Sequence, residues 1–205
     1  MAHELEIVNG QARMFYSGET PWHGMGKRVD HLLTADEALT EGGLNWLVEK
    51  VPAYDMHPDG SFVQIPDNYN IRRDEDLKVL GRVGGDYTPI QNHEAFSFFD
   101  ALVDSGEAKY ETAGSLFGGK KIWLTAKLPD FTVCGEEFHG YLLLSTTHDG
   151  SRALRAATTM IRAVCNNTVT MGFSGAKTTW SLHHKTTLEG KVQEARETLQ
   201  MAHKA

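Results

Sequence analysis

The feature that most constrains the fold is a pair of alternating segments on either side of two glycines. The stretch "AKYETAGSLFGGKKIWLTAKLP" alternates apolar and polar residues before and after Gly118 and Gly119, a pattern typical of a β-hairpin. A third apolar strand follows in "FHGYLLLSTTHDG", and Asp149 and Gly150 predict the turn that ends it. The second half of the chain is therefore expected to begin as a three-stranded antiparallel meander.

Helices and further short strands are predicted around this meander. Thr34 and Glu37 have the spacing of a capping box, so "TADEALTEGG" is expected to form a short helix. Asn92 is placed to cap a second helix in "HEAFSFFDALVDSG", where the apolar residues recur at helical spacing. Between them, "LNWLVEKV", "SFVQI", "YNIRR" and "KVLGRVG" indicate short strands separated by turns.

The chain of 205 residues is expected to be one domain. It has no internal repeat and no Pro/Gly-rich linker, and we predict an α+β fold in which antiparallel β-meander and hairpins pack against helices over residues 1–205. Residues 1–33 are expected to be an irregular N-terminal segment, and residues 188–204 a C-terminal amphipathic helix. No run approaches the roughly 18 apolar residues of a membrane-spanning helix, and the N-terminus does not resemble a signal peptide. A soluble, cytoplasmic protein that does not enter a membrane is therefore expected.

Charge is distributed unevenly along this acidic chain, whose net charge is −7. Residues 1–105 hold 8 Lys and Arg against 18 Asp and Glu, a net charge of −10, whereas residues 106–205 hold 12 against 9, a net charge of +3. Residues 146–188 contain five basic residues and only one acidic residue, Asp149. Such asymmetry indicates an anionic ligand, a solvated face, or a basic half that meets the acidic half of another subunit.

The local structure of the arginine-rich stretch "THDGSRALRAATTMIRAVCNNT" decides what its cations can do. On a helix, Arg152, Arg155 and Arg162 would lie within about 80° of one another and form one cationic stripe. On a strand, Arg155 would point to the opposite face from the other two. The β-branched residues favour a strand and the alanines favour a helix, so both alternatives stay open.

The common enzyme and cofactor motifs are missing from the sequence. "FGGKK" lacks the spacing of a phosphate-binding P-loop, "GRVGG" lacks the dinucleotide fingerprint, and neither HExxH nor GxSxG occurs. Cys134 and Cys165 form no CxxC motif and are expected to be reduced structural thiols. We therefore predict no metal, no cofactor and no catalytic residue.

The basic residues of the hairpin and of the arginine-rich stretch together form a candidate nucleic-acid interface. Proteins that bind single strands combine a basic groove that follows the phosphates with aromatic rings on which bases stack. Trp123, or Tyr110, is the candidate stacking ring, and the alternative is that Trp123 packs in the core while the lysines reach solvent. The predicted interface consists of Lys120, Lys121, Trp123, Lys127, Arg152, Arg155 and Arg162.

The order of several sequence blocks resembles a known family. "GETPWHGMGKRV", "GDYTPIQNHEAFSFFDALV", the hairpin, and "YLLLSTTHDGSRALRAATTMIRAVCNNTV" occur in the order seen in phage/plasmid-like proteins that are grouped as a domain of unknown function. The resemblance implies a phage or mobile-element setting inside a bacterial cell, and no established activity. A basic hairpin in a three-stranded meander followed by a helix is also similar in architecture to Rad52-type single-strand annealing proteins, which is a likeness of fold alone.

Three functions are compatible with these observations. The leading hypothesis is a DNA-metabolism protein that binds single-stranded nucleic acid, DNA being favoured, as an oligomeric ring or filament with annealing activity. The second is a homo-oligomeric assembly protein without affinity for nucleic acid. The third is an enzyme acting on a phosphorylated small molecule, with arginines that hold the phosphate and His148 or Asp149 as acid or base.

Overall fold

A seven-stranded sheet forms the body of the molecule. The computed structural model describes residues 3–31, 33–103, 109–129, 131–133 and 136–199. The strand order is β14-β13-β12-β9-β8-β3-β4, and every neighbouring pair is antiparallel except β3 with β4. The strands are β3 (Met14–Ser17), β4 (Lys27–Val29), β8 (Lys109–Leu116), β9 (Lys121–Lys127), β12 (Tyr141–Thr147), β13 (Leu154–Thr159) and β14 (Thr179–Leu182).

The predicted meander is the centre of this sheet. Strands β8, β9 and β12 are neighbours in that order, and Phe117–Gly119 form a short 3₁₀ turn between β8 and β9. All three residues of the turn have positive φ, at 54°, 66° and 95°, and glycine reaches this region without steric cost. The two glycines of the sequence therefore close the hairpin as predicted.

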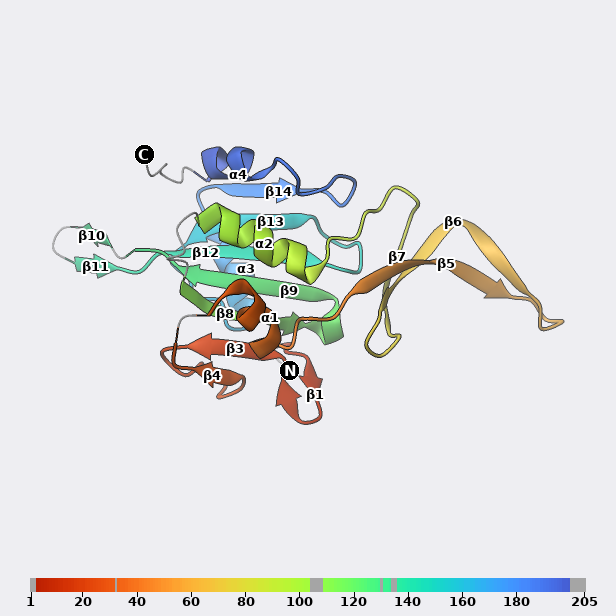
Figure 1. Cartoon of the computed structure of the whole chain (residues 1–205), viewed down its shortest axis with the longest axis horizontal. Helices are drawn as coiled ribbons and strands as arrows, with labels where there is room; N and C mark the ends of the chain where they lie inside the picture. Colours follow the sequence, from red (N-terminus) through yellow and green to blue (C-terminus); the bar gives the residue numbers. More distant parts are fainter. Residues whose placement is uncertain (1–2, 32, 104–108, 130, 134–135, 200–205) are drawn as a thin grey trace.

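A second sheet extends from the body as an arm. It consists of β5 (Val48–Met56), β6 (Phe62–Arg73) and β7 (Val79–Val83) in the order β5-β6-β7, and its distal end projects away from the main sheet (Figure 1). The segments "SFVQI" and "YNIRR", expected as separate strands, are parts of the single twelve-residue strand β6. We refer to β5, β6 and β7 together as the arm.

Helices cover both faces of the main sheet (Figure 1). One face packs against α1 (Ala35–Glu41), α2 (Asn92–Val103) and α4 (Val192–Thr198), and the other against α3 (Asn166–Ser174). The capping box predicted at the start of α1 is present. The α2-side core also includes apolar side chains from the base of the arm, so the arm and the body share one hydrophobic core.

The α+β class predicted from the sequence is confirmed, with differences at the two ends. Residues 1–33, expected to be irregular, contain a small hairpin of β1 (Ile7–Val8) and β2 (Gln11–Ala12) as well as β3 and β4. Strand β3 forms because the edge of β8 supplies a template for pairing, and β4 pairs with β3. The C-terminal helix α4 is shorter than the predicted 188–204, and residues 200–205 lie outside the described part. A further short hairpin joins β10 (Phe131–Val133) to β11 (Glu136–Phe138). Within the described ranges, no helix is both long and apolar enough to cross a membrane.

Candidate functional site

A pocket of about 840 Å³ lies on the α3 side of the main sheet, at the end where β9 begins and β12 ends. Four cations line it, namely Lys120, Lys121, Arg152 and Arg155, and Asp149 is the one carboxylate among its lining residues. We call it the cationic pocket. The other residues of its wall are Phe117, Ser145, Thr147, Ser151, Ala153, Asn166, Thr170, Phe173 and Ser174.

The register of three strands brings the floor of the pocket together. Ser145 of β12 lies opposite Arg155 of β13, and Thr147 of β12 lies opposite Lys121 of β9. Ser145 and Thr147 are two positions apart on β12, and side chains alternate along a strand. These two residues and their partners Arg155 and Lys121 therefore share one face of the sheet. The two basic segments of the sequence thus meet across β12, which separates them in the sheet and supplies hydroxyl groups between them.

Helix α3 forms the opposite wall. Asn166, Thr170 and Ser174 recur every four residues and therefore lie on one side of the helix. The helix approaches the sheet closely at Gly172, where a Cβ would lie 2.8 Å from a methyl carbon of Leu143. The polar side of α3 thereby faces the cations of the pocket.

The pocket concentrates positive charge in a partly desolvated place. Burial, together with Arg152 and Arg155, lowers the pKa of Lys121 from 10.5 to about 8. Burial and the neighbouring Arg152 also lower the pKa of Arg155, whose guanidinium lies 4.3 Å from the ring centre of Phe173. None of the four cations forms an ion pair with a carboxylate of the described residues. An anion from outside the chain would relieve this mutual repulsion.

The donors of the pocket suit an oxyanion such as phosphate. Guanidinium and ammonium groups form charge-assisted hydrogen bonds to phosphate oxygens, and the hydroxyl groups of Ser and Thr add neutral donors. Within the described residues, no group of three or more His, Cys, Asp or Glu side chains is placed to hold a metal ion. Of the two acid–base candidates, Asp149 lines the pocket, whereas His148 is fully buried and its Nε2 lies 2.9 Å from Oδ1 of Asn92.

The comparison with protein families identifies the chain. Residues 79–205, more than half of it, match the model of a family described as a domain of unknown function (DUF932). The chain belongs to this family. No curated protein and no solved structure matches it. In this DUF932 protein every residue that lines the cationic pocket lies within the matched part, whereas β5 and β6 of the arm precede it.

The DUF932 chain brings four of the seven predicted interface residues together in the cationic pocket: Lys120, Lys121, Arg152 and Arg155. Within the arginine-rich stretch, β13 covers only Leu154–Thr159, and the last three residues of the stretch begin α3. Since Arg152 precedes that strand and lies in the turn after β12, the alternation that would have separated it from Arg155 does not apply.

The prediction that Trp123 or Tyr110 offers a stacking face is wrong. Trp123 is 0% exposed, because α3 and the N-terminal segment cover its face of β9. Its Nε1 donates to Oγ1 of Thr112 and to the carbonyl oxygen of Ala163, both at 3.2 Å. Tyr110 is 3% exposed, and its hydroxyl donates to Oδ1 of Asp100 at 2.6 Å. Both rings belong to the core.

The two remaining predicted cations lie elsewhere. Arg162 is a structural residue, because its Nε donates to Oε1 of Glu111 and its Nη2 to the carbonyl oxygen of Ser17, both at 2.7 Å. Lys127 shares its strand face with Lys121 but is six residues further along β9, roughly 20 Å at 3.3 Å per residue. Neither residue lines the cationic pocket.

The uncharged part of the site was not predicted from the sequence. The hydroxyl groups of β12 and of α3, together with Asn166 and Phe117, became lining residues only through strand register and helix packing. A partial signal was present, because Asn166, Thr170 and Ser174 recur every four positions in the sequence, as on one side of a helix. The distance between "YLLLSTT" and "NNTVTMGF" in the sequence hid their contact in space.

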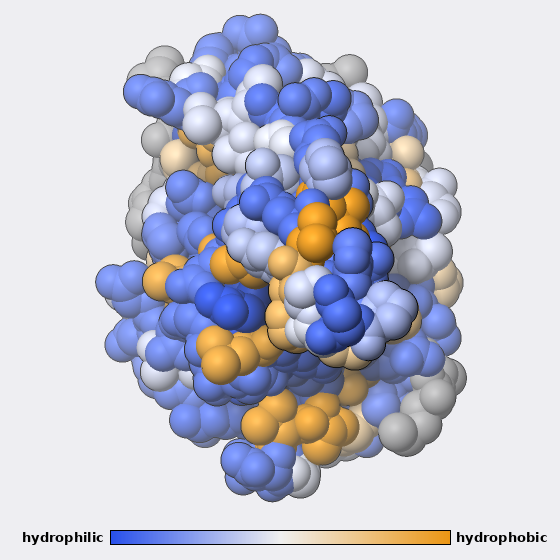
Figure 2. Space-filling model, turned by 90° about the vertical axis from the view of Figure 1, so that its right-hand side faces the viewer, coloured by the Kyte–Doolittle hydropathy of each residue, from blue (hydrophilic) through white to orange (hydrophobic). Residues whose placement is uncertain are grey.

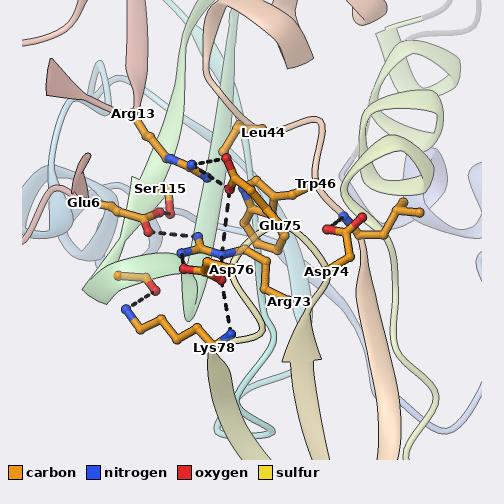
Figure 3. A network of polar contacts seen from close by, with 12 residues as sticks. Glu6, Arg13, Leu44, Trp46, Arg73, Asp74, Glu75, Asp76, Lys78 and Ser115 are labelled. Atoms are coloured by element: carbon orange, nitrogen blue, oxygen red, sulfur yellow. Dashed lines mark hydrogen bonds and ion pairs between the residues drawn. The ribbon is translucent and has the colours of Figure 1, made fainter. Parts of the chain in front are cut away.

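A buried ion network positions the turn that forms the rim of the pocket (Figure 3). Arg73, at the end of β6, is 2% exposed, and its Nη1 donates to Oε1 of Glu6 at 2.8 Å. The other carboxylate oxygen of Glu6 accepts a hydrogen bond from Ser115 on β8. Nearby, Nζ of Lys78 donates to the carbonyl oxygen of Gly118 at 2.9 Å. The arm, the N-terminal segment and the rim turn are thereby joined by polar contacts.

Proposed function

We propose that this chain is a phage or mobile-element DNA-metabolism protein that binds single-stranded nucleic acid, DNA being favoured, in the cytoplasm of a bacterial host. The observation that supports the proposal is the cationic pocket itself. In a chain of net charge −7, four cations converge from two turns and the beginnings of two strands, without a carboxylate ion pair among the described residues. The phosphate backbone is a polyanion that would satisfy such a group of cations.

The proposed mechanism is electrostatic capture of phosphates, without bond chemistry and without a cofactor. Lys120, Lys121, Arg152 and Arg155 contact phosphate oxygens, and the hydroxyl groups of β12 and α3 orient them. Phe117, which is 42% exposed at the rim, takes the stacking role that the buried Trp123 cannot have. Strand annealing is the activity we propose to test, following the likeness of the meander to annealing proteins.

The test is fluorescence anisotropy with labelled oligo-dT over a series of salt concentrations. Lys120 and Arg152 are both exposed, so replacing them changes charge with little effect on folding. The double variant Lys120→Gln with Arg152→Gln should reduce the magnitude of the slope of log K against log salt by about one to two. The reason is that fewer counterions are released on binding when fewer phosphates are contacted.

The matched control removes two positive charges from exposed residues outside the pocket. Arg28→Gln with Lys177→Gln makes the same change in net charge at exposed positions. Its salt slope should equal that of the wild type if the pocket is the binding site. Equal slopes for both double variants, or no binding by the wild-type protein at low salt, would contradict the proposal.

A second candidate function, self-assembly, is favoured by the exposed distal part of the arm. There β5 pairs with β6 alone, since β7 pairs only with Tyr69–Arg72 of β6. Met56 lies opposite Phe62, and Tyr54, two residues from Met56, shares their face. The three side chains are 66%, 68% and 53% exposed, and Figure 2 shows apolar atoms on the arm that points toward the viewer. Two strands alone are marginally stable in water, so this face is suited to a protein interface.

We propose a second copy of this chain as the occupant of that face, on grounds of charge. Residues 54–67 hold three carboxylates and no Lys or Arg, whereas residues 146–188 hold five basic residues and one acidic residue. Two arms would repel each other, so the arm of one subunit meets the basic half of the next. Contacts between different surfaces generate rings or filaments.

Mass photometry over a series of salt concentrations tests this assembly. The wild-type protein should form oligomers that dissociate as salt rises, and Met56→Ser with Phe62→Ser should be monomeric. Trp22→Ser, at an exposed apolar residue outside both the arm and residues 146–188, is the control and should assemble normally. A wild-type protein that is monomeric throughout would contradict the proposal.

A further inference from the structure

A second cavity, of about 580 Å³, lies beside the cationic pocket and shares part of its wall. Ser151, Arg152 and Ala153 line both cavities, so the turn between β12 and β13 separates them and Arg152 stands at the boundary. We call this cavity of about 580 Å³ the second cavity. Its other lining residues are Asp67, Arg82, Val83, Gly84, Gly85, Asp86, Tyr87, Gly150, His183, His184 and Lys185.

Packing contacts hold the wall and floor of the second cavity in place. The hydroxyl of Tyr87 donates to the carbonyl oxygen of Thr147 at 3.0 Å, and its ring stacks on His184 with centroids 4.8 Å apart and planes at 11°. A Cβ at Gly81 would collide with the backbone of Asp149, which shows how closely β7 packs against the turn. The arm base and the main sheet therefore form the second cavity together.

The charges of the second cavity continue those of the cationic pocket. Arg82 and Arg152 are exposed, and neither guanidinium forms an ion pair with any carboxylate that the structure describes. Lys185 pairs with Asp86 at 3.2 Å, but both side chains are largely exposed, so the pair contributes little. The other carboxylate that lines the second cavity, Asp67, already accepts a hydrogen bond from the backbone N–H of Gly85 at 2.9 Å. Cations free to meet a ligand thus lie on both sides of the turn.

The geometry points to a polyanion rather than a single phosphorylated molecule as the ligand. A small ligand would occupy one cavity and would leave the unpaired cation on the far side of the turn without a role. A single strand bound in a basic groove carries phosphates at regular intervals and contacts several cations in succession.

We propose that a nucleic-acid strand runs from the cationic pocket across Arg152 into the second cavity, where Arg82 and Lys185 contact its next phosphates. This inference rests on the proposed function and adds the path of the strand. It also assigns a binding role to Arg82 of β7, at the base of the arm.

The experiment compares oligonucleotides of different length. Labelled dT4, as the short strand, and dT16, as the long strand, are titrated against the wild type, Arg82→Gln with Lys185→Gln, and Lys120→Gln with Arg152→Gln. Both Arg82 and Lys185 are exposed, and thermal melting confirms that each variant is folded. The Arg82 and Lys185 variant should lose about tenfold in affinity for dT16 and keep wild-type affinity for dT4. The Lys120 and Arg152 variant should lose affinity for both.

The outcomes separate the path from the proposed function. If the wild-type protein binds dT16 and the Arg82 and Lys185 variant binds it equally well, the path is wrong and binding at the cationic pocket stands. An equal loss for dT4 and dT16 would show one merged site and would also overturn the path. If the wild-type protein binds neither oligonucleotide, the proposed function itself fails.

Discussion

Removing the charge of Lys121 should stabilise the free protein while weakening its binding to nucleic acid. Lys121 is partly buried and faces Arg152 and Arg155, and both burial and these neighbours lower its pKa from 10.5 to about 8. Its charged form is therefore less favourable in the folded protein than in the unfolded chain. Met preserves most of the aliphatic stem and removes the charge, so Lys121→Met should raise the free energy of unfolding at pH 7.

The size and the pH dependence of this effect follow from the pKa. For a fully buried group, a fall from 10.5 to about 8 corresponds to roughly 3 kcal/mol, and solvent screening of this partly exposed side chain reduces it to about 1–2 kcal/mol. Because the folded-state pKa lies below the unfolded value, the destabilisation is fully present below pH 8 and disappears as the pH rises toward 10.5. The melting temperature of Lys121→Met should exceed that of the wild type by about 2–8 °C at pH 7, and the difference should vanish near pH 10.5.

Differential scanning fluorimetry from pH 6 to pH 10.5 measures this difference directly. Lys120→Met is the matched control, because Lys120 also lines the pocket but is exposed and should leave the melting temperature unchanged. Both variants should bind oligo-dT more weakly. If Lys121→Met lowers the melting temperature at pH 7, Lys121 is a structural residue and the view of the pocket as an unneutralised cationic site is wrong.

Three further results are expected. At constant ionic strength, the affinity for oligo-dT should not change with pH below pH 7 and should fall about tenfold between pH 7 and pH 9 as Lys121 deprotonates. If a Lys121→Arg variant keeps this pH dependence, another group is responsible for it. In urea unfolding, Trp123→Phe should lower the free energy of unfolding by about 1–3 kcal/mol, because two buried acceptors lose the indole N–H. The salt slope of oligo-dT binding should not change, and a changed slope would place the ring at the interface. Arg162→Met should destabilise the fold by a similar amount, because it leaves Glu111 and the carbonyl oxygen of Ser17, both partly buried, without their donor. An accompanying loss of DNA affinity would show that Arg162 belongs to the binding site.

Much of the fold could be predicted because its signals are local. Turn glycines, alternation and a capping box act within a few residues, so the hairpin at Gly118 and Gly119, the meander and the start of α1 were all recognised. The strands β3 and β4 within residues 1–33 were missed because such short strands form only against a partner. The partner of β3 is β8, about a hundred residues away, and β4 in turn pairs with β3.

The candidate site shows the same division. Local charge identified Lys120, Lys121, Arg152 and Arg155, but the same reasoning included Trp123 and Arg162, whose burial and pairing depend on distant residues. A strand pattern states which residues share a face, and it does not state which face a helix will cover. The position of α3 over Trp123 decided that this ring belongs to the core.

The sequence by itself determined the α+β class, the central meander and the presence of two basic segments in an acidic chain. Tertiary structure decided that those segments meet across β12, that hydroxyl groups line the space between them, and that a second cavity opens beyond Arg152. The physical reason is one of range: backbone geometry and turn chemistry act between neighbours in the chain. Pairing register, burial and the pKa of Lys121 depend on groups that only the folded chain brings together.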